Sequence, residues 1–260
     1  PCPHAQVYLP RCMSAFVGAD ITTALLASGI CSKPDTRMLV DIGTNGEIAL
    51  WHRGQLSCCS TAAGPAFEGA GLSMGMAGKT GAVDHVRVQD GALQAHVIGG
   101  GAPKGICGSG VIDALACLVE LEQLDETGLL EQDPAPVAPP VCLTQKDVRM
   151  VQLAKSAICA GLSTLLRVEG LCGADAAELA VAGGFGSYLD VDSAGRIGLL
   201  PEELVPRVRV LGNAALSGAA MLLLNRGFIP RSEALAAGAR TVDLSTSAEF
   251  MNAYTEGMFF

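Results

Sequence analysis

The string DIGTNGE at residues 41–47 combines residue types that could hold a phosphate group. An apolar run predicts a strand that ends at Asp41, and a second strand is expected to follow the turn. Glycines let the backbone approach an anion and adopt positive φ, so the N–H groups of the turn and a threonine hydroxyl can contact phosphate oxygens. Asp41 could hold Mg²⁺, directly or through water, and the residues expected to contact phosphate are Gly43, Thr44, Asn45 and Gly46. An ordinary hairpin, in which Asn-Gly only makes the turn, is the alternative.

Two further glycine motifs follow predicted strands later in the chain. The string ELAVA predicts a buried strand that leads into Gly183, Gly184 and Phe185, where the backbone could pass close beneath a flat ligand such as adenine. The string VRVL predicts another strand, which leads through Gly212 and Asn213 into a helix rich in alanine and glycine. Taken singly, each motif is also explained by a strand-to-helix turn or by close helix packing. All three motifs in this order favour one shared nucleotide site.

Other reactive side chains give weaker signals. Glu68, in the glycine-rich string STAAGPAFEGAG, could orient Mg²⁺ or an attacking water, or could equally cap a helix. Asp41 and Glu68 are therefore the candidates for a catalytic role. The four histidines (4, 52, 85 and 96) show no ligand spacing, and the ten cysteines contain no C-x-x-C pair, so no structural metal or iron–sulfur cluster is expected in this chain. The cysteines are expected to be free, buried thiols.

The elements that would position these residues form an α/β pattern. Three strands in succession are expected over residues 37–60, and a hairpin over residues 83–98 turns at Asp90-Gly91. Thr144 and Asp147 resemble a capping box that starts a long helix to residue 169. Helices then alternate with strands, which predicts a mixed sheet: an antiparallel meander continued by parallel strands and flanked by helices.

Three local predictions concern the rest of the chain. The proline-rich string DPAPVAPP, residues 133–140, is expected to be a linker or surface loop. Residues 211–224 are too short to span a membrane and are predicted to form a buried helix. Thr246 and Glu249 are expected to mark the start of a capped helix near the end of the chain.

Composition limits the classes of function. Half of the 260 residues are apolar and mean hydropathy is positive at +0.39, so a sizeable core is expected. A net charge of −9 argues against a nucleic-acid surface, and no apolar stretch is long enough to predict a membrane span. With no secretion signal, the cysteines predict a reducing, cytoplasmic compartment. Because Pro1 stands where an initiator Met would be, we expect the chain to begin inside a longer polypeptide.

Six strings together resemble a known family far more specifically than any single glycine motif. They are VDIGTNGEI, STAAGPAFEGAG, GICGSGVIDA, LTQKDVRMVQLAKSAI, VAGGFGSYLD and LGNAALSGAA. They are similar to the reductive activators of corrinoid enzymes, and the resemblance covers residues 7–260. The family pairs an N-terminal [2Fe–2S] domain with an actin-like (ASKHA, ribonuclease H-like) ATPase fold in two halves. Since only one Asp-x-Gly-Thr loop is present, the resemblance implies the C-terminal half as a single subdomain, with a possible small insertion around residues 82–142.

What the resemblance implies is a repair activity. Such activators deliver one electron from their iron–sulfur cluster to return inactive Co(II) corrinoid to Co(I), coupled to ATP and Mg²⁺. The implied partner is the corrinoid protein of a methyltransferase system, with Ser14, in the loop before the first predicted helix, as a possible contact. The [2Fe–2S] domain and the first ATPase half would lie upstream of Pro1, so this chain alone is expected to be inactive. Two alternatives stay open: a small-molecule kinase of the same superfamily, and a non-catalytic module for homodimer formation or partner docking.

Overall fold

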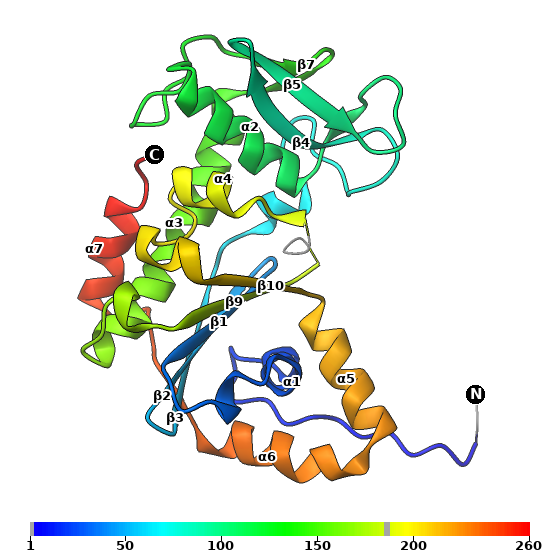
Figure 1. Cartoon of the computed structure of the whole chain (residues 1–260), viewed down its shortest axis with the longest axis vertical. Helices are drawn as coiled ribbons and strands as arrows, with labels where there is room; N and C mark the ends of the chain where they lie inside the picture. The colour runs from blue at the N-terminus through cyan, green and yellow to red at the C-terminus, as the bar shows by residue number, and fades with distance from the viewer. Residues whose placement is uncertain (1–2, 185–187) are drawn as a thin grey trace.

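A six-stranded mixed sheet forms the centre of the protein in the computed structural model, which describes residues 3–184 and 188–260 (Figure 1). Its strand order is β10-β9-β1-β2-β3-β11. β1, β2 and β3 form the predicted antiparallel meander, and β9, β10 and β11 join it as parallel strands. The strands are β1 Arg37–Ile42, β2 Gly46–His52, β3 Gln55–Thr61, β9 Glu178–Ala182, β10 Val208–Gly212 and β11 Ala239–Thr241. The sequence prediction of this sheet is confirmed.

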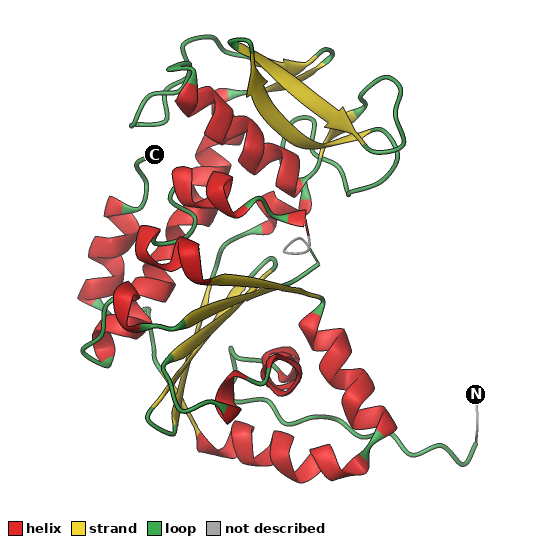
Figure 2. Cartoon of the chain, viewed as in Figure 1, coloured by secondary structure: helices red, strands yellow, loops and turns green. Residues whose placement is uncertain are grey.

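Both faces of the sheet are covered by helices, as the layers in Figure 2 show. Because both faces are covered, strand β1 is apolar at successive positions. Leu39 belongs to the core on the side of α1, whereas Met38 and Val40 belong to the larger core on the side of α3. Helices α1, α5 and α6 lie on the first side, and α3 and α7 on the second (Figure 1). The helices are α1 Ala19–Ser28, α2 Gly108–Glu120, α3 Gln145–Val168, α4 Val191–Arg196, α5 Ala214–Leu224, α6 Ile229–Gly238 and α7 Ala248–Glu256.

A second, smaller sheet lies at the top of the view in Figure 1, beside α2. It contains β4 Ala82–Gln89, β5 Ala92–Val97 and β6 Gly105–Ile106, and the predicted hairpin is formed by β4 and β5. The proline-rich string predicted as a loop contains a strand instead: β7 Ala135–Ala138 pairs with β8 Val141–Leu143. Proline is tolerated there because this two-stranded ribbon has free edges that need no N–H donor at every position.

Two helix predictions near the end of the chain also need correction. Helix α7 is capped by Ser247, whose side chain accepts from the Phe250 N–H, and not by Thr246. Helix α5 is not buried: only three residues of its inner face are, while Leu216, Leu223 and Leu224 are 65%, 85% and 84% exposed. Hydropathy could not predict this, because α5 is apolar all round and shows no polar face. The predicted capping box at Thr144 and Asp147 is confirmed at the start of α3.

The chain ends in a tail held by a buried lysine. Lys155 of α3 is fully buried, and its Nζ donates hydrogen bonds to the carbonyl oxygens of Gly257, at 2.8 Å, and Phe259. The same Nζ lies 4.6 Å from the centre of the Phe260 ring. Burial lowers the pKa of Lys155 to about 8, because the ammonium ion loses water without gaining a carboxylate partner. The contacts join the tail to the middle of the longest helix.

The cysteines of the described residues are free, as the sequence predicts. Burial is less general than expected, because Cys12 and Cys172 are exposed, whereas Cys58, Cys59, Cys107 and Cys117 are buried. In the described part of the chain, no helix is both long and apolar enough to cross a membrane.

Candidate functional site

A cavity of about 360 Å³ lies at the edge of the main sheet where β1, β9 and β10 end. These strands are parallel, so their carboxyl ends lie side by side, the usual place for a ligand in an α/β sheet. Most of the residues predicted from the three glycine motifs line this cavity: Asp41, Gly43, Thr44, Asn45, Gly183, Gly184 and Asn213. The fold thus brings together segments that are about 140 and 170 residues apart in sequence.

The turn between β1 and β2 presents free backbone donors to the cavity. The Gly43 N–H donates to the Asn45 carbonyl at 3.1 Å, which closes the turn, and the Thr44 carbonyl accepts from the Gly64 N–H at 2.8 Å. Among the described residues, the N–H groups of Thr44 and Asn45 have no partner. Gly46 does not line the cavity: a Cβ there would lie 2.6 Å from the Thr61 hydroxyl oxygen, so this glycine serves close packing of β2.

The second motif passes directly beneath β1. Gly183 has a φ of +111°, and a Cβ at this position would lie 2.4 Å from the Ile42 carbonyl oxygen, so only glycine fits. Its N–H donates to the Gly212 carbonyl at 3.0 Å, which ties the second motif to the third. Gly184 has an open surrounding and lines the cavity. Phe185, also predicted to contact nucleotide, lies outside the described residues.

The third motif turns a helix end toward the cavity. Asn213 caps α5, since its side-chain oxygen accepts from the Leu216 N–H at 2.9 Å. Asn213 and Ala215 line the cavity, so the N-terminus of α5, which carries partial positive charge, faces it. Gly212 lies behind them and does not line it.

Two acidic residues that the sequence prediction did not assign join Asp41 at this cavity. Asp20 comes from the first turn of α1, and Glu47 stands directly opposite Asp41 in the β1–β2 pair. Burial, with the nearby Asp20 carboxylate, raises the pKa of Asp41 to about 6. Burial and the same Asp20 charge raise the pKa of Glu47 to about 7, against a hydrogen bond from the Gly18 N–H. Glu47 could have been predicted here because it belongs to the string DIGTNGE. Asp20 could not, because its place in the sequence indicated only the start of a helix.

This donor set fits a cation–phosphate pair better than phosphate alone. Three carboxyl groups would repel a bare phosphate, whereas the free N–H groups and the α5 N-terminus would attract one. Mg²⁺ is usually bound in proteins by one or two carboxylates, several waters and phosphate oxygens. Among the described residues, no group of three or more His, Cys, Asp or Glu is placed to hold a metal ion.

Glu68 lies beside the cavity and does not line it. Its Oε1 accepts a hydrogen bond of 2.8 Å from the Thr44 hydroxyl. In this arrangement the Thr44 hydroxyl proton is used by Glu68, so a phosphate oxygen would have to displace Glu68 to receive it.

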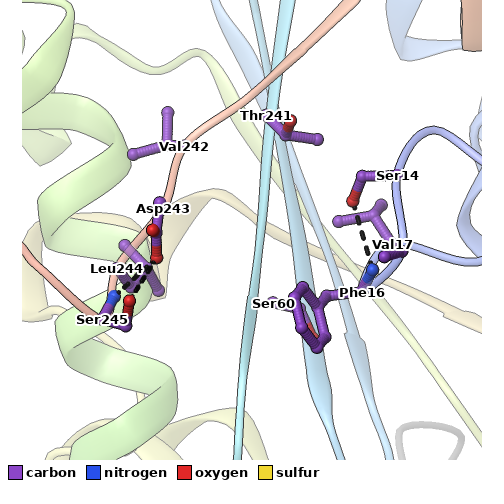
Figure 3. A pocket seen from close by; sticks show the side chains of 10 residues that line it. Ser14, Phe16, Val17, Ser60, Thr241, Val242, Asp243, Leu244 and Ser245 are labelled. Carbon is purple, nitrogen blue, oxygen red and sulfur yellow. Dashed lines mark hydrogen bonds between the residues drawn. The ribbon is translucent and has the colours of Figure 1, made fainter.

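Ser14, the predicted partner contact, lines a separate cavity of about 470 Å³ (Figure 3). Its hydroxyl oxygen accepts from the Phe16 N–H at 3.3 Å, and Phe16 itself is 83% exposed. Ser60 and the segment 241–245 form the other wall. A third cavity, of about 390 Å³, includes Phe16 and also Asn45 and Glu47 of the phosphate turn. The Ser14 loop is therefore adjacent to the predicted phosphate site but not part of it.

Comparison with known proteins agrees with this geometry. Residues 35–260 match the model of the family described as the C-terminal domain of RACo, the ASKHA domain. The chain belongs to this family. The ASKHA fold is thereby confirmed, and with the relatives below so is the resemblance to corrinoid activators.

Individual relatives of this RACo-type ASKHA domain are named for work on corrinoid proteins. The corrinoid activation enzyme RamQ of Eubacterium limosum is 38% identical over 287 residues, covering 99% of this chain and 48% of RamQ. The [Co(II) methylated amine-specific corrinoid protein] reductase of Methanosarcina barkeri is 29% identical, covering 86% of this chain and 45% of the reductase. A solved structure of a reductive activator for a corrinoid, iron–sulfur protein superposes with a TM-score of 0.90 at 31% identity, covering 98% of this chain and 44% of that one. The chain spans about half the length of these relatives.

Proposed function

We propose that this chain is the nucleotide-binding C-terminal part of an ATP-dependent reductive activator. The activator would return the Co(II) corrinoid of a methyltransferase system's corrinoid protein to Co(I). The convergence of three glycine motifs and a strand-end Asp on one cavity carries the nucleotide part of this proposal. Family membership and the names of two relatives support the corrinoid part.

The residues divide the binding of ATP and Mg²⁺ between them. The Thr44 and Asn45 N–H groups and the α5 N-terminus would hold phosphate oxygens. Asp41 would orient Mg²⁺ through water, and Mg²⁺ when bound neutralises charge on the phosphates. Gly184 would let the backbone lie close under the base, because it lines the cavity and has open space where a side chain would project. Glu68 would orient the attacking water once Thr44 releases it.

The redox step would need a [2Fe–2S] domain, which we place upstream of this domain. One electron would pass from a reduced [2Fe–2S] cluster to Co(II), giving an oxidised cluster and Co(I). That transfer is uphill, so nucleotide and corrinoid partner must prefer different conformations of the activator. We further propose that residues 1–260 form one C-terminal ATPase subdomain, in which residues 82–142 are an insertion, and that a first ATPase half completes the nucleotide site.

Titration calorimetry with Mg-ATP tests the nucleotide proposal. We expect weak or no binding to this chain alone, because one half of the phosphate site is missing, and clear binding when the chain is joined to its upstream half. Asp41→Asn in the joined protein should reduce affinity for Mg-ATP, while Asp243→Asn, at an exposed loop away from the cavity, should not. Tight binding to the isolated chain would contradict the split site.

The corrinoid proposal has its own assay. The joined protein with its iron–sulfur domain should accelerate reduction of Co(II) corrinoid protein only when ATP is present, as followed by corrinoid absorbance. A rate independent of ATP would contradict the coupling while leaving nucleotide binding intact.

A further inference from the structure

A second polar cavity, of about 480 Å³, lies on the small sheet and is remote in sequence from the glycine motifs. Strands β4 and β5 form one wall, and α2 and the residue before α4 form another. The residues that carry chemistry here are His85, His96, Asp113 and Asp190. None of them has a role in the proposed nucleotide or redox function.

The register of the β4–β5 hairpin places the two histidines opposite each other, and an irregularity next to them brings Asp84 to the same position. Val83 pairs with Val97, but His85 pairs with His96, so Asp84 is an extra residue in β4. Such a bulge places two residues of one strand opposite one residue of the other. Asp84 and His85 therefore both stand opposite His96, and directly opposed side chains lie on the same face about 5 Å apart at Cβ.

Each imidazole is held at one nitrogen by a carboxylate. The His85 Nδ1 is 2.9 Å from Asp113 Oδ2, and the His96 Nδ1 is 2.5 Å from Asp84 Oδ1. Among the described residues, neither Nε2 has a hydrogen-bond partner. A histidine that binds a metal almost always donates its other ring N–H to a carboxylate or carbonyl, which fixes the tautomer and leaves a lone pair for the ion. Both histidines already have this arrangement, in the same cavity.

Asp113, the carboxylate that holds His85, is buried and has one oxygen without a hydrogen-bond partner among the described residues. The Asp113 side chain is only 4% exposed, and it lines the cavity. Its Oδ2 accepts from His85 and from the Val86 N–H, but its Oδ1 has no hydrogen-bond partner among the described residues. Burial raises the pKa of Asp113, and interactions with His85 and with the Ser193 side chain lower it only in part. A buried, unpaired carboxylate oxygen costs free energy that a nearby positive charge would reduce.

Charge around the cavity also favours a cation. Three carboxylates lie at or beside the cavity: Asp84, Asp113 and Asp190. The permanently charged base that lines it is Arg87, whose guanidinium is 3.5 Å from the Gln94 side-chain oxygen. A single His–Asp pair would be explained as an ordinary structural contact. Two pairs that open on one cavity, with an unpaired carboxylate oxygen behind them, are not explained in that way.

We propose that His85 and His96 bind a divalent first-row transition ion, such as Zn²⁺ or Ni²⁺, through their Nε2 atoms. Imidazole nitrogen is a preferred ligand for these ions. Since no third His, Cys, Asp or Glu of the described residues is placed as a direct ligand, water completes the coordination shell. Asp113 and Asp84 act as positioning residues, because they hold the two rings.

Calorimetric titration of Ni²⁺ into the 260-residue chain tests the site. The chain should carry Cys12→Ser and Cys172→Ser, because these exposed thiols are competing ligands. We expect one ion to bind per chain, at least tenfold more weakly after either His85→Ala or His96→Ala. Asp113→Asn should weaken binding about tenfold, as loss of such a supporting carboxylate usually does.

His52→Ala is the matched control, because the His52 Nδ1 is engaged by the Thr36 hydroxyl on the main sheet. It should leave Ni²⁺ affinity unchanged. Far-UV circular dichroism of each variant checks that it folds, and a Co²⁺ visible spectrum without thiolate charge-transfer bands identifies nitrogen and oxygen ligands. No saturable binding, an affinity unchanged in His85→Ala and His96→Ala, or a thiolate spectrum would overturn the proposal.

Discussion

At the scale of single residues, the acidic side chains around the phosphate turn are placed where they cost stability. Burial raises the pKa values of Asp41 and Glu47 to about 6 and about 7, so at neutral pH the fold holds Asp41 charged in a site that disfavours the charge. Asp20 adds to this, since it is a further negative group at the same cavity. Perturbed pKa values of this kind cluster at functional sites.

Asp41→Asn should therefore make the isolated chain more stable. Between pH 4 and pH 6 the folded state binds more protons than the unfolded state, because the Asp41 pKa is raised to about 6. The free energy of unfolding therefore falls as pH rises through this window, and the full cost of the Asp41 charge is present above about pH 6. One pKa unit corresponds to about 1.4 kcal/mol, so the gain at pH 7 is up to about 3 kcal/mol. Urea unfolding at pH 7 and at pH 5 measures it, and the gain should be smaller at pH 5.

Asp243→Asn is the control for Asp41→Asn, because the pKa of Asp243 is lowered in the fold and that of Asp41 is raised. The Asp243 carboxylate accepts from the Ser245 N–H and hydroxyl, and these hydrogen bonds hold its pKa below the usual range. Its replacement should lower stability or leave it unchanged. An Asp41→Asn variant that is no more stable than wild type at pH 7 would contradict the cost assigned to Asp41.

At the scale of elements, helices α1 and α5 are packed with their backbones almost in contact. A Cβ at Gly218 would lie 1.9 Å from the Thr23 carbonyl oxygen and 2.5 Å from its carbonyl carbon. These are backbone atoms, which cannot move aside as a flexible side chain does. The Gly/Ala-rich sequence of α5 is what permits this approach.

Gly218→Ala should lower the free energy of unfolding by about 1–3 kcal/mol, the usual cost of overpacking. The variant gains helix propensity, which offsets only part of that cost. Gly238→Ala in α6 is the matched control, because a Cβ there meets nothing within 4 Å, and it should be neutral or slightly stabilising. Urea denaturation followed by far-UV circular dichroism compares the two; equal stabilities would show that α1 and α5 can separate freely.

Helices and strands that are marked by turn or capping residues in the sequence could be predicted. Those whose burial or pairing depends on residues far away in the sequence could not. The β4–β5 hairpin follows from Asp90-Gly91, and the start of α3 from its capping box. The exposed outer face of α5 and the strand at Ala135–Ala138 depend on what packs or pairs with them, which no local pattern contains. Hydropathy alone therefore assigned α5 to the interior.

At the scale of the whole molecule, one apolar core runs from the main sheet into the segment around residues 82–142. The same cluster contains Met38 and Ile48 of the main sheet, Val111 and Leu115 of α2, and Leu143 of β8. Because the core is continuous, the segment should not unfold by itself.

Cysteine alkylation during urea unfolding measures this cooperativity. Cys58 reports on the main sheet and Cys117 on α2, and both are buried thiols. We expect them to become reactive at the same urea concentration, as resolved by peptide mass spectrometry, while the exposed Cys172 reacts without urea. Reaction of Cys117 at a lower urea concentration than Cys58 would show that the segment is an independent unit.

The two sites differ in how far the sequence could predict them. Each glycine motif follows its own strand, so the nucleotide cavity could be assembled from three local patterns and strand order. Asp20 reaches the same cavity from another element, and no pattern near it pointed there. His85 and His96 are eleven positions apart, a spacing that matches no metal motif. The register of the hairpin about Asp90-Gly91 places them opposite one another, whereas the extra residue that brings Asp84 to His96 has no local signal in the sequence.

The close contact at Gly218 has a mechanical consequence. Helix α1 is preceded by Gly18 and carries Asp20 in its first turn, and helix α5 is capped by Asn213, so both helix starts border the phosphate cavity or the adjacent cavity. Because their backbones are in close contact at Gly218, we expect α1 and α5 to move as one rigid unit whose N-terminal ends reach the phosphate cavity. We therefore expect a displacement of the start of α1 to carry the start of α5 with it, and the loop with Phe16, which leads directly into the start of α1, to follow.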